Sequence, residues 1–237
     1  MKAMILAAGL GTRFKPWTDR HPKALAPVNG KTLLERNITY LQSFGIKDIL
    51  VNVHHFAEQI MDAVKFNNGW GSRVTISNES DELLETGGGL KKAAAYFDQG
   101  SFLMMNADIL TDLDLKKMIS FHEEKKPLAT LAVTNRKSSR YFLFDKNDRL
   151  SGWRNTKTGE EKISIPRKTQ TEKAFSGIHL ISPKIFPLMH QQGKFSIVDV
   201  YLELAPSQAI LGFDHSGSKL VDVGRPESVS IAECLFE

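Results

Sequence analysis

Glycines and cations near the N-terminus are of the residue types that bind phosphate. Residues 8–12 read A-G-L-G-T, Arg13 follows them directly, and Lys23 comes ten residues later, after Pro22. Small residues let backbone N–H groups approach phosphate oxygens, and a guanidinium offers a planar fork of donors that suits phosphate. Lys23 lies among small and apolar residues, where its charge needs a partner, and a phosphate is the natural one. Together these residues predict a site for a phosphorylated ligand.

The glycine loop completes neither of two common nucleotide-binding motifs. A G-x-G-x-x-G loop needs a third glycine at position 14, where the chain has Phe14, and a P-loop needs a G-K-[ST] ending that does not follow. The glycines alone also fit a tight turn at the end of a strand, with Arg13 as a surface residue. The pairing with Lys23 is what favours the phosphate interpretation.

Strands and helices alternate along the first half of the chain. Continuous apolar runs predict buried strands, and apolar residues at helical spacing predict helices. Strands are expected at 3–8, 48–53, 73–77, 101–106 and 128–134, and helices at 32–45, 56–64, 88–97 and 112–124. This alternation indicates an α/β fold, namely a Rossmann-like, mostly parallel mixed sheet with helices on both faces. Loops that follow parallel strands meet at one sheet edge, so residues 8–14, the segment before 88 and residues 106–108 should converge on one crevice.

The second half of the chain has a different pattern. A hairpin is expected from 141–145 and 149–153, and a strand at 173–182 precedes a short helix near Pro183. A helix at 197–205, a strand at 219–224 and a closing amphipathic helix at 225–236 complete the chain. No linker or repeat separates the halves, so the second half is expected to be a small β extension or lid on a single domain over 1–237.

Bulk properties exclude several classes of protein. The chain has 237 residues, a formal net charge of +4 and a single cysteine, Cys234, which excludes a disulfide framework and a cysteine zinc site. The apolar run at the N-terminus is too short for a signal peptide, and charged residues follow it too soon. No apolar run approaches the length of a membrane span. We therefore expect a cytoplasmic protein without a membrane partner. The basic segment 154–173 alternates with glutamates and lacks stacking aromatics, which favours a solvated loop or hairpin over a nucleic-acid surface.

Two further features are interpreted as structural. His54 and His55 could suggest a metal pair, but adjacent side chains at a strand end point apart. Met104 and Met105 lie in an expected buried strand and should fill the core.

Residues 6–35, L-A-A-G-L-G-T-R…P-K-A-L-A-P-V-N-G-K, resemble the signature of the sugar-1-phosphate nucleotidyltransferases. Three further motifs extend the resemblance over nearly the whole chain. E-T-G-G-G at 85–89 is similar to the base-contacting loop of that family, N-A-D at 106–108 to its metal-binding segment, and V-D-V-G-R-P-E at 221–227 to its second metal segment. Length, the E-T-G-G-G loop and the D-V-G-x-P-E ending are most similar to the short N-acetylmuramate-1-phosphate uridylyltransferase subgroup.

The resemblance implies a nucleotidyltransferase fold and a reaction between two anionic substrates. A sugar 1-phosphate oxygen attacks the α-phosphorus of a nucleoside triphosphate, and pyrophosphate leaves, so charge neutralisation and in-line positioning are the main needs. Arg13 would hold the β- and γ-phosphates, Lys23 would stabilise charge at the α-phosphate, and Asp108 and Asp222 would hold Mg²⁺. Taken singly, Asp108 could instead cap a helix and Asp222 could lie in a turn.

The resemblance also divides the chain into a nucleotide-binding half, 1–135, and a sugar-binding half with the closing helix, 136–237. The implied nucleotide-binding residues are Leu6, Ala8, Gly9, Gly11, Thr12, Arg13, Lys23, Thr86, Gly87, Gly88 and Asn106. The implied sugar-binding residues are Glu172, Ser176 and Gly177. On this side the chain departs from the family, which often has Tyr-Gly where this chain has Tyr141-Phe142, and Glu-Lys-Pro where Ala174 follows Lys173.

The resemblance predicts one reaction class but leaves several substrates open. UTP and N-acetylmuramate 1-phosphate, or a related amino-sugar phosphate, are the substrates that the resemblance favours. The alternatives are a guanylyl- or thymidylyltransferase for another hexose or heptose 1-phosphate, and a non-catalytic nucleotide-sugar binding protein of the same fold. Phosphocholine cytidylyltransferases share the opening motif, but E-T-G-G-G and the D-V-G-R-P-E ending argue against them. The oligomeric state stays open.

Overall fold

A ten-stranded sheet connects the two halves of the chain in the computed structural model, which describes residues 1–236. Its strands lie in the order β11-β10-β9-β12-β6-β1-β4-β5, with β8 beside β12 and β13 beside β8. The strands of the first half are β1 (Lys2–Leu6), β4 (Asp48–Val53), β5 (Arg73–Asn78), β6 (Phe102–Asn106) and β8 (Ala129–Thr134). Those of the second half are β9 (Arg140–Phe144), β10 (Leu150–Asn155), β11 (Glu161–Ile163), β12 (Thr171–Ile181) and β13 (Ile210–Asp214).

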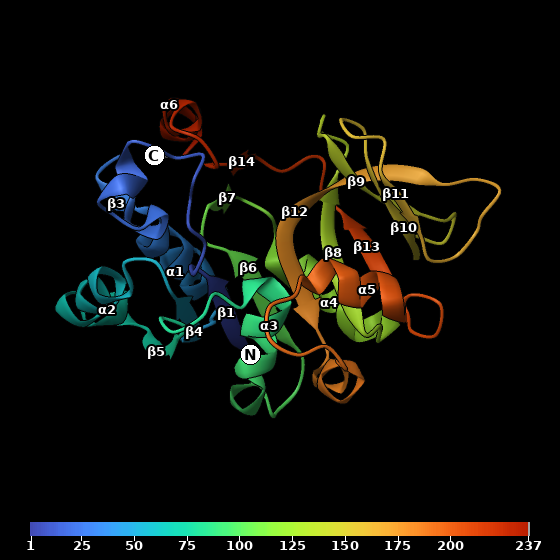
Figure 1. The fold of residues 1–237 in the computed structure, drawn as a ribbon, viewed down its shortest axis with the longest axis horizontal. Coiled ribbons are helices and arrows are strands. Elements are labelled where there is room, and N and C mark those ends of the chain that lie inside the picture. The colour runs from blue at the N-terminus through green and yellow to red at the C-terminus, as the bar shows by residue number, and fades with distance from the viewer. Residues whose placement is uncertain (237) are drawn as a thin grey trace.

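Strand direction changes between the two halves, as the predicted mixed sheet requires. β1 runs parallel to β4 and β6, and β4 runs parallel to β5. β12 is antiparallel to β6, β8 and β9, and the predicted hairpin of β9 and β10 is extended by β11. Figure 1 shows β12 between the first half of the chain and this antiparallel extension.

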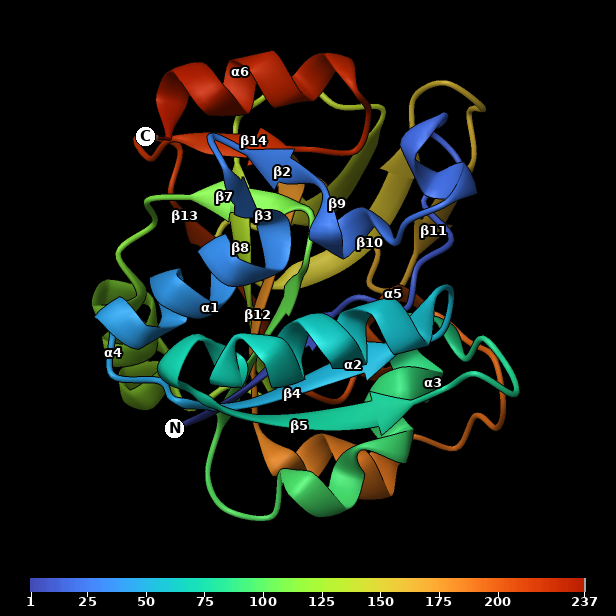
Figure 2. The ribbon, with the colours of Figure 1, turned by 90° about the vertical axis from the view of Figure 1, so that its left-hand side faces the viewer.

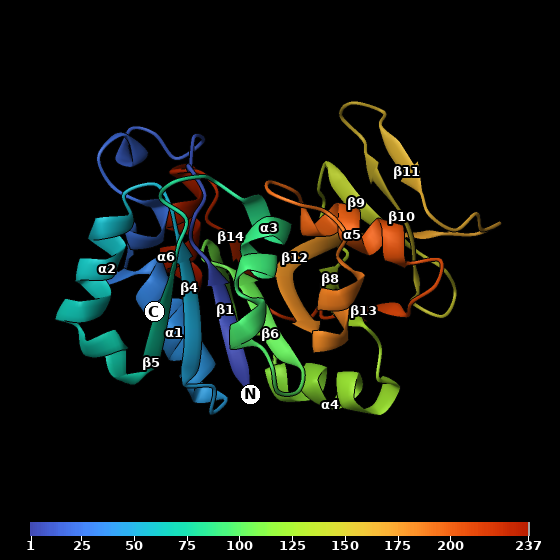
Figure 3. The ribbon, with the colours of Figure 1, turned by 60° about the horizontal axis from the view of Figure 1, so that its bottom comes forward.

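Helices cover both faces of the sheet. On one face lie α1 (Leu33–Ser43), α2 (Ala57–Phe66) and α4 (Leu115–Lys125), and on the other lie α3 (Glu85–Lys92) and α5 (Ile197–Leu204). Side chains of β1 alternate between the faces, because Ala3 and Ile5 pack in the first core and Met4 in the second. Met104 and Met105 are fully buried, one in each core, as predicted. Figure 3 shows α3 in front of the parallel strands.

Helix α1 forms as its sequence predicts. The Thr32 hydroxyl accepts a hydrogen bond from the Glu35 backbone N–H at 3.1 Å, which caps the first turn. Leu34, Ile38 and Leu41 are fully buried on one face, and the helix ends before Gly45, whose φ of +77° suits a glycine. The helix therefore fixes the segment that follows Lys23.

A second layer of short strands lies beside the main sheet and was not predicted in full. β7 (Ile109–Thr111) pairs with β14 (Leu220–Asp222), and β2 (Pro27–Val28) pairs with β3 (Lys31–Thr32). The closing helix α6 (Glu227–Leu235) packs over them, and Figure 2 shows this arrangement. Five short 3₁₀ helices complete the residues described: η1 (Trp17–Asp19), η2 (Lys23–Leu25), η3 (Asn68–Gly71), η4 (Ala94–Tyr96) and η5 (Pro183–Leu188).

Several element boundaries differ from the expected ones. The helix expected at 88–97 begins three residues earlier and ends at Lys92, before η4. The helix expected at 112–124 begins after Asp114, whose carboxylate accepts from the Lys116 and Lys117 N–H groups. Asp114, and not Asp108, is therefore the cap of α4. Within residues 1–236, no helix combines the length and apolar character needed to cross a bilayer.

Candidate active site

The glycine loop leaves the end of β1 and folds tightly on itself. The Gly11 carbonyl accepts from the Phe14 N–H at 2.8 Å and from the Thr18 hydroxyl at 2.9 Å. Gly11 has a φ of +61°, and a Cβ there would lie 2.8 Å from Thr18 Cγ2, so a larger residue would not fit. Arg13 follows on the exposed side of this turn, where its guanidinium can reach a ligand.

A buried polar network supports the loop from below. Asn52, at the end of β4, accepts from the Ala7 N–H at 2.8 Å and donates to Glu79 at 2.9 Å. Both side chains are almost completely buried, so the network holds the start of the loop in one position. Neither residue was predicted to belong to the site, although a polar Asn52 in the apolar run of 48–53 indicated a buried polar contact there.

Lys23 has a carboxylate partner in the structure. Its ammonium donates to Asp108, which follows β6, and both side chains are largely buried, with 13% and 23% of their surface exposed. The sequence predicted that this buried cation needs an anionic partner and favoured a phosphate, and in the structure the partner is the Asp108 carboxylate. A nucleotide phosphate near Lys23 would compete with that carboxylate for the same ammonium.

Pairing of β7 with β14 brings the second carboxylate to the first. Asp222 lies opposite Ile109 in this pair, and the Val223 N–H donates to the Asp108 carbonyl at 2.8 Å. Burial raises the pKa of Asp222, and the nearby Asp108 charge raises it further, while Lys23, Arg13 and Arg136 act in the opposite direction. The short strands thus place two carboxylates and several cations in one electrostatic cluster.

The two carboxylates fit a magnesium ion by their chemistry. Residues 1–236 contain no group of three or more His, Cys, Asp and Glu side chains that could hold a metal ion unaided. Mg²⁺ usually keeps several waters and binds through one or two carboxylates together with phosphate oxygens of a substrate. Asp108 and Asp222 supply this donor set, whereas they would not complete a zinc site.

A cavity of about 600 Å³, here called the inner cavity, collects most of the predicted nucleotide-binding residues. Those that line it are Leu6, Ala8, Gly9, Gly11, Thr12, Arg13, Lys23, Thr86 and Asn106, together with Asp108. Residues that the sequence analysis did not single out also line it, namely Ala7, Leu10, Ala24, Asn52, Leu83, Glu85, Ala107, Lys194, Ser196 and Gly224. The predicted convergence of the three loop segments at one crevice is therefore observed.

Gly87 and Gly88 have a packing role in this structure and do not line the inner cavity. Their N–H groups donate to the Phe195 carbonyl at 2.9 and 3.3 Å. A Cβ on Gly87 would lie 2.5 Å from the Phe195 ring, and one on Gly88 would lie 2.3 Å from the Gly193 carbonyl oxygen. These glycines let α3 approach the segment 193–197, and of the three predicted residues Thr86, Gly87 and Gly88 it is Thr86 that lines the cavity.

A second cavity of about 830 Å³, the outer cavity, adjoins the first. Arg13 and Ser196 line both cavities, and Asp222 lines the outer one. Aromatic side chains form part of its wall: Tyr141, Phe142, Trp153 and Phe175. Flat apolar walls next to a phosphate-binding centre are suited to a sugar ring.

The three residues expected to bind sugar do not line the outer cavity. Glu172 forms an exposed ion pair with Arg154, with 2.5 Å between oxygen and nitrogen. Ser176 is buried and in hydrogen-bond contact with His215 at 2.7 Å. A Cβ on Gly177, which has a φ of +73°, would lie 2.8 Å from Asn106, so this glycine makes room for a residue of the inner cavity.

The two adjacent histidines are held by backbone carbonyls. His54 is in hydrogen-bond contact with the Glu79 carbonyl at 2.6 Å, and His55 with the Thr18 carbonyl at 3.4 Å. This agrees with the structural interpretation of the pair.

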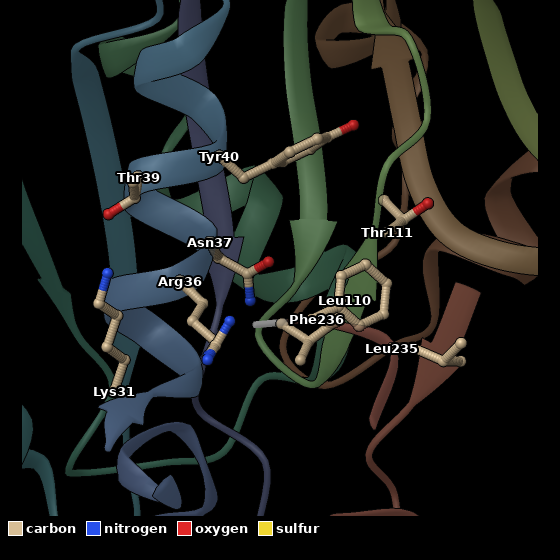
Figure 4. Close-up of a pocket in the computed structure, with 9 residues that line it drawn as sticks. All are labelled: Lys31, Arg36, Asn37, Thr39, Tyr40, Leu110, Thr111, Leu235 and Phe236. Carbon is tan, nitrogen blue, oxygen red and sulfur yellow. The ribbon is translucent and has the colours of Figure 1, made fainter. Parts of the chain in front are cut away.

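A third cavity, of about 380 Å³, lies apart from this centre. Figure 4 shows it between α1, the segment with Leu110 and Thr111, and the C-terminal Leu235 and Phe236. Lys31 and Arg36 line it, but Arg36 already donates to the Val28 carbonyl at 2.9 Å. The lining contains neither Arg13, Lys23 nor the two aspartates.

Comparison with known proteins assigns the chain to a family. Residues 2–233 match the family model described as nucleotidyl transferase, and the chain belongs to that family. It is 41% identical over 108 residues to an N-acetylmuramate alpha-1-phosphate uridylyltransferase of Caulobacter vibrioides, covering 45% of each chain. It is 26% identical over 240 residues to a mannose-1-phosphate guanyltransferase of Yarrowia lipolytica, covering all of this chain and 64% of that enzyme.

Among solved structures, HddC from Yersinia pseudotuberculosis in complex with GMP-PN is similar over the whole chain. The TM-score is 0.80 at 26% identity, and the alignment covers 100% of this chain and 99% of HddC. The α/β fold with a mixed, mostly parallel sheet is also that of a putative glucose-1-phosphate thymidylyltransferase from Bacillus anthracis, with a TM-score of 0.81 at 18% identity over 99% of this chain and 94% of that chain.

Proposed function

We propose that this chain joins a nucleoside triphosphate to a sugar 1-phosphate, giving a nucleoside diphosphate sugar and pyrophosphate. The observation that carries the proposal is the meeting of two cavities at Arg13, with Lys23, Asp108 and Asp222 beside them. One cavity is lined by small residues and backbone, as a nucleotide requires, and the other has aromatic walls. We further propose that residues 1–237 act as one domain with a nucleotide half, 1–135, and a sugar half, 136–237.

The chain's own side chains position the substrates and balance their charge. An oxygen of the sugar 1-phosphate forms a bond to the α-phosphorus, and the bond from that phosphorus to the bridging oxygen of pyrophosphate breaks. Arg13 holds the β- and γ-phosphates and then the leaving pyrophosphate, while Lys23 stabilises the charge on the α-phosphate. Lys23 has to exchange or share its contact with Asp108 when the phosphate arrives. Mg²⁺ bound by Asp108 and Asp222 would add charge neutralisation at the phosphates.

For the substrates we propose UTP and N-acetylmuramate 1-phosphate or a related amino-sugar phosphate. The support is the 41% identity to the Caulobacter N-acetylmuramate alpha-1-phosphate uridylyltransferase over nearly half of the chain. The Yarrowia guanyltransferase, which aligns with all of this chain, is only 26% identical to it.

A guanine nucleotide is the second candidate donor. HddC, whose structure contains GMP-PN, aligns over the whole chain, and so does the Yarrowia guanyltransferase. The base would be read largely by backbone groups at Leu6 and Ala8, which do not by themselves distinguish one base from another. A purely nucleotide-sugar binding protein is disfavoured, because it would not need the leaving-group cation Arg13 or the carboxylate pair.

A pyrophosphate-release assay tests the proposal. Each of the four common NTPs is combined with a panel of sugar 1-phosphates in the presence of Mg²⁺, and the nucleoside diphosphate sugar is identified by mass spectrometry. We expect turnover with UTP and an N-acetylated sugar 1-phosphate, and none without the sugar. Preferred use of GTP would select the second candidate, and absence of product with every pair would refute the transferase function.

A further inference from the structure

The lining of the outer cavity carries more cations than carboxylates. Its cations are Arg13, Arg136, Arg140, Lys157, Lys162 and Arg225, and its carboxylates are Asp199 and Asp222. Lys162 and Asp199 form an ion pair at 2.9 Å and neutralise each other. Asp222 is then the one carboxylate left in this lining to balance the other five cations. None of these five forms an ion pair among the residues described. This unbalanced charge attracts anions.

Three of these cations belong to the reaction centre. Arg13 also lines the inner cavity and is assigned to the triphosphate. Arg136 lies close enough to Asp222 to act on it electrostatically, and Arg225 follows Asp222 by three residues. The Arg136 guanidinium donates to the Phe175 carbonyl at 2.8 Å, while its buried Nε has no protein partner among the described residues. Arg136 and Arg225 are therefore placed to hold the 1-phosphate of the sugar.

Arg140 and Lys157 line the outer cavity from the open end of the β9–β10 hairpin, where Arg140 begins β9 and Lys157 follows the end of β10. Arg140 lies opposite Asn155 in the strand register, and the Thr156 N–H donates to the Ser139 carbonyl at 2.8 Å. The Asn155 side chain then accepts from the Lys157 N–H at 3.1 Å, which shapes the turn that carries this lysine. Figure 1 shows the ends of β9 and β10 side by side.

Two like charges that line one cavity and have no carboxylate partner do not stabilise the fold. An anion between them would be attracted to both. Ser138, Ser139 and Thr158 line the same part of the cavity and add hydroxyl donors. A neutral sugar ring gives these two cations nothing to neutralise.

We propose that the acceptor is a sugar 1-phosphate with a second anionic substituent, which Arg140 and Lys157 bind. This inference rests on the proposed transferase function and narrows its acceptor. A carboxylate and a second phosphate share the required chemistry, since both accept charge-assisted hydrogen bonds from arginine and lysine.

Two matched pairs of acceptors test the inference and separate the two anions. The full chain is assayed for pyrophosphate release with its preferred NTP and Mg²⁺. N-acetylmuramate 1-phosphate, which carries a carboxylate, is compared with N-acetylglucosamine 1-phosphate, and glucose 1,6-bisphosphate is compared with glucose 1-phosphate. We expect kcat/KM to be about 10-fold or more higher for the charged member of one pair, and that pair identifies the anion.

Substitutions then assign the preference to residues. Arg140→Gln and Lys157→Gln should each lower the ratio of charged to neutral kcat/KM by about 10-fold. Lys168→Gln is the matched control, because Lys168 is an exposed lysine of the same half that lines neither cavity. It should leave the ratio unchanged.

The remaining outcomes are also decisive. Equal or higher kcat/KM for the neutral member of both pairs would overturn the inference and leave the transferase function standing. An equal loss on charged and neutral acceptors in the two variants would overturn the assignment to Arg140 and Lys157. No product with any NTP and any acceptor would overturn the proposed function, and the inference with it.

Discussion

At the scale of single residues, the proposed reaction requires contacts of the centre to exchange when the ligands bind. Lys23 and Asp108 satisfy each other in the structure, although the proposed reaction assigns one to a phosphate and the other to a metal ion. Their pairing keeps a largely buried ammonium and carboxylate compensated until the substrate arrives. The same pairing means that replacing either residue leaves the other without its partner.

Replacing Lys23 by alanine should lower kcat by about 10²–10³, since one positioned charge near the reacting phosphate is lost. Lys15→Ala is the control, because Lys15 is an exposed lysine of the same loop that pairs with Asp19. Steady-state pyrophosphate release measures the effect, and circular dichroism confirms that the variant is folded. Wild-type turnover in a folded Lys23→Ala protein would remove Lys23 from the mechanism.

Replacing Asp108 or Asp222 by asparagine should raise the Mg²⁺ concentration needed for half-maximal rate, since each substitution removes a charged oxygen ligand. Asp199→Asn is a suitable control, because Asp199 lines the outer cavity but pairs with Lys162. The measurement is a Mg²⁺ titration of the initial rate at saturating NTP. A variant that keeps the wild-type titration curve would show that its residue does not bind the metal.

The sequence predicted the residues of the centre that lie in contiguous motifs, and missed those that only the fold brings together. Arg13 and Lys23 stand in one short segment with recognisable chemistry. Arg136 follows β8 and Arg140 begins β9, and nothing in their sequence spacing connects them to Asp222. Glu172 was expected at the sugar, but it forms an ion pair with Arg154 and does not line the outer cavity.

At the scale of elements, close approach of α3 to the segment 193–197 closes the inner cavity. The glycines of α3 permit this approach, which explains why the expected start of the helix was too late. The expected helix began at Gly88, whereas α3 begins at Glu85 and buries Gly87, Gly88 and Gly89 in its first turns.

Replacing Gly88 by alanine should destabilise the protein by about 1–3 kcal/mol, because the new Cβ overlaps the Gly193 carbonyl oxygen. Gly217→Ala is the matched control, since no atom lies within 4 Å of the Cβ that it would introduce. Chemical denaturation measures the free energy of unfolding of both variants. Equal stability of the two would contradict the close packing of α3.

Short strands were the elements least accessible to prediction. β7 was not expected: it has three residues and gains its hydrogen bonds from β14, more than a hundred residues away, whereas the strand expected at 219–224 is observed as β14. β13 was not expected at all, because its apolar run is brief and its pairing with β8 is non-local. Longer elements such as α1, β4 and β12 carry enough periodicity to be identified from sequence alone.

Helix α4 is attached to the sheet through a buried histidine, and this attachment should depend on pH. His122 contacts Thr130 at 2.8 Å and Ser101 at 3.0 Å, and burial lowers its pKa to about 4. Its neutral form is therefore favoured in the folded state. The stability that His122 contributes is present above the ordinary pKa near 6.5 and is lost as the pH falls towards 4.

We expect His122→Gln to reduce the loss of stability on acidification by about 1.4 kcal/mol for each pH unit below 6.5. His190→Gln is the control, because His190 is exposed. Urea denaturation at a series of pH values between 7 and 4 gives the slope. Parallel pH dependence of the His122→Gln and wild-type proteins would show that this histidine is not responsible.

At the scale of the whole molecule, we propose that each half of the sheet binds one of the two substrates. The inner cavity lies chiefly on the parallel strands of the first half, and the outer cavity lies chiefly on the antiparallel extension. Arg13 lines both, so a triphosphate bound in the inner cavity would place its charge at the entrance of the outer one. The segment 154–171 contains the end of β10 and all of β11, which pair as a hairpin, and Lys162 connects it to α5 through Asp199.

This division predicts an ordered reaction. The nucleotide binds to a rigid sheet edge supported by Asn52 and Glu79, whereas the sugar binds partly to a hairpin that can close over it. Mg²⁺-NTP should therefore bind tightly without sugar, and the sugar 1-phosphate should bind much more weakly without nucleotide. Isothermal titration calorimetry measures both dissociation constants.

Two variants distinguish binding of the nucleotide from binding of the sugar 1-phosphate. Lys23→Ala should weaken NTP binding and leave binding of the sugar 1-phosphate to the free protein unchanged, because Lys23 lines only the inner cavity. Arg136→Gln should do the reverse, because Arg136 lines only the outer cavity, and its effect on the sugar should be about 10-fold for one lost charge-assisted contact. If the sugar 1-phosphate binds equally well with and without nucleotide, the order is random. In that case the two cavities bind their ligands independently, although the same residues could still perform the transfer.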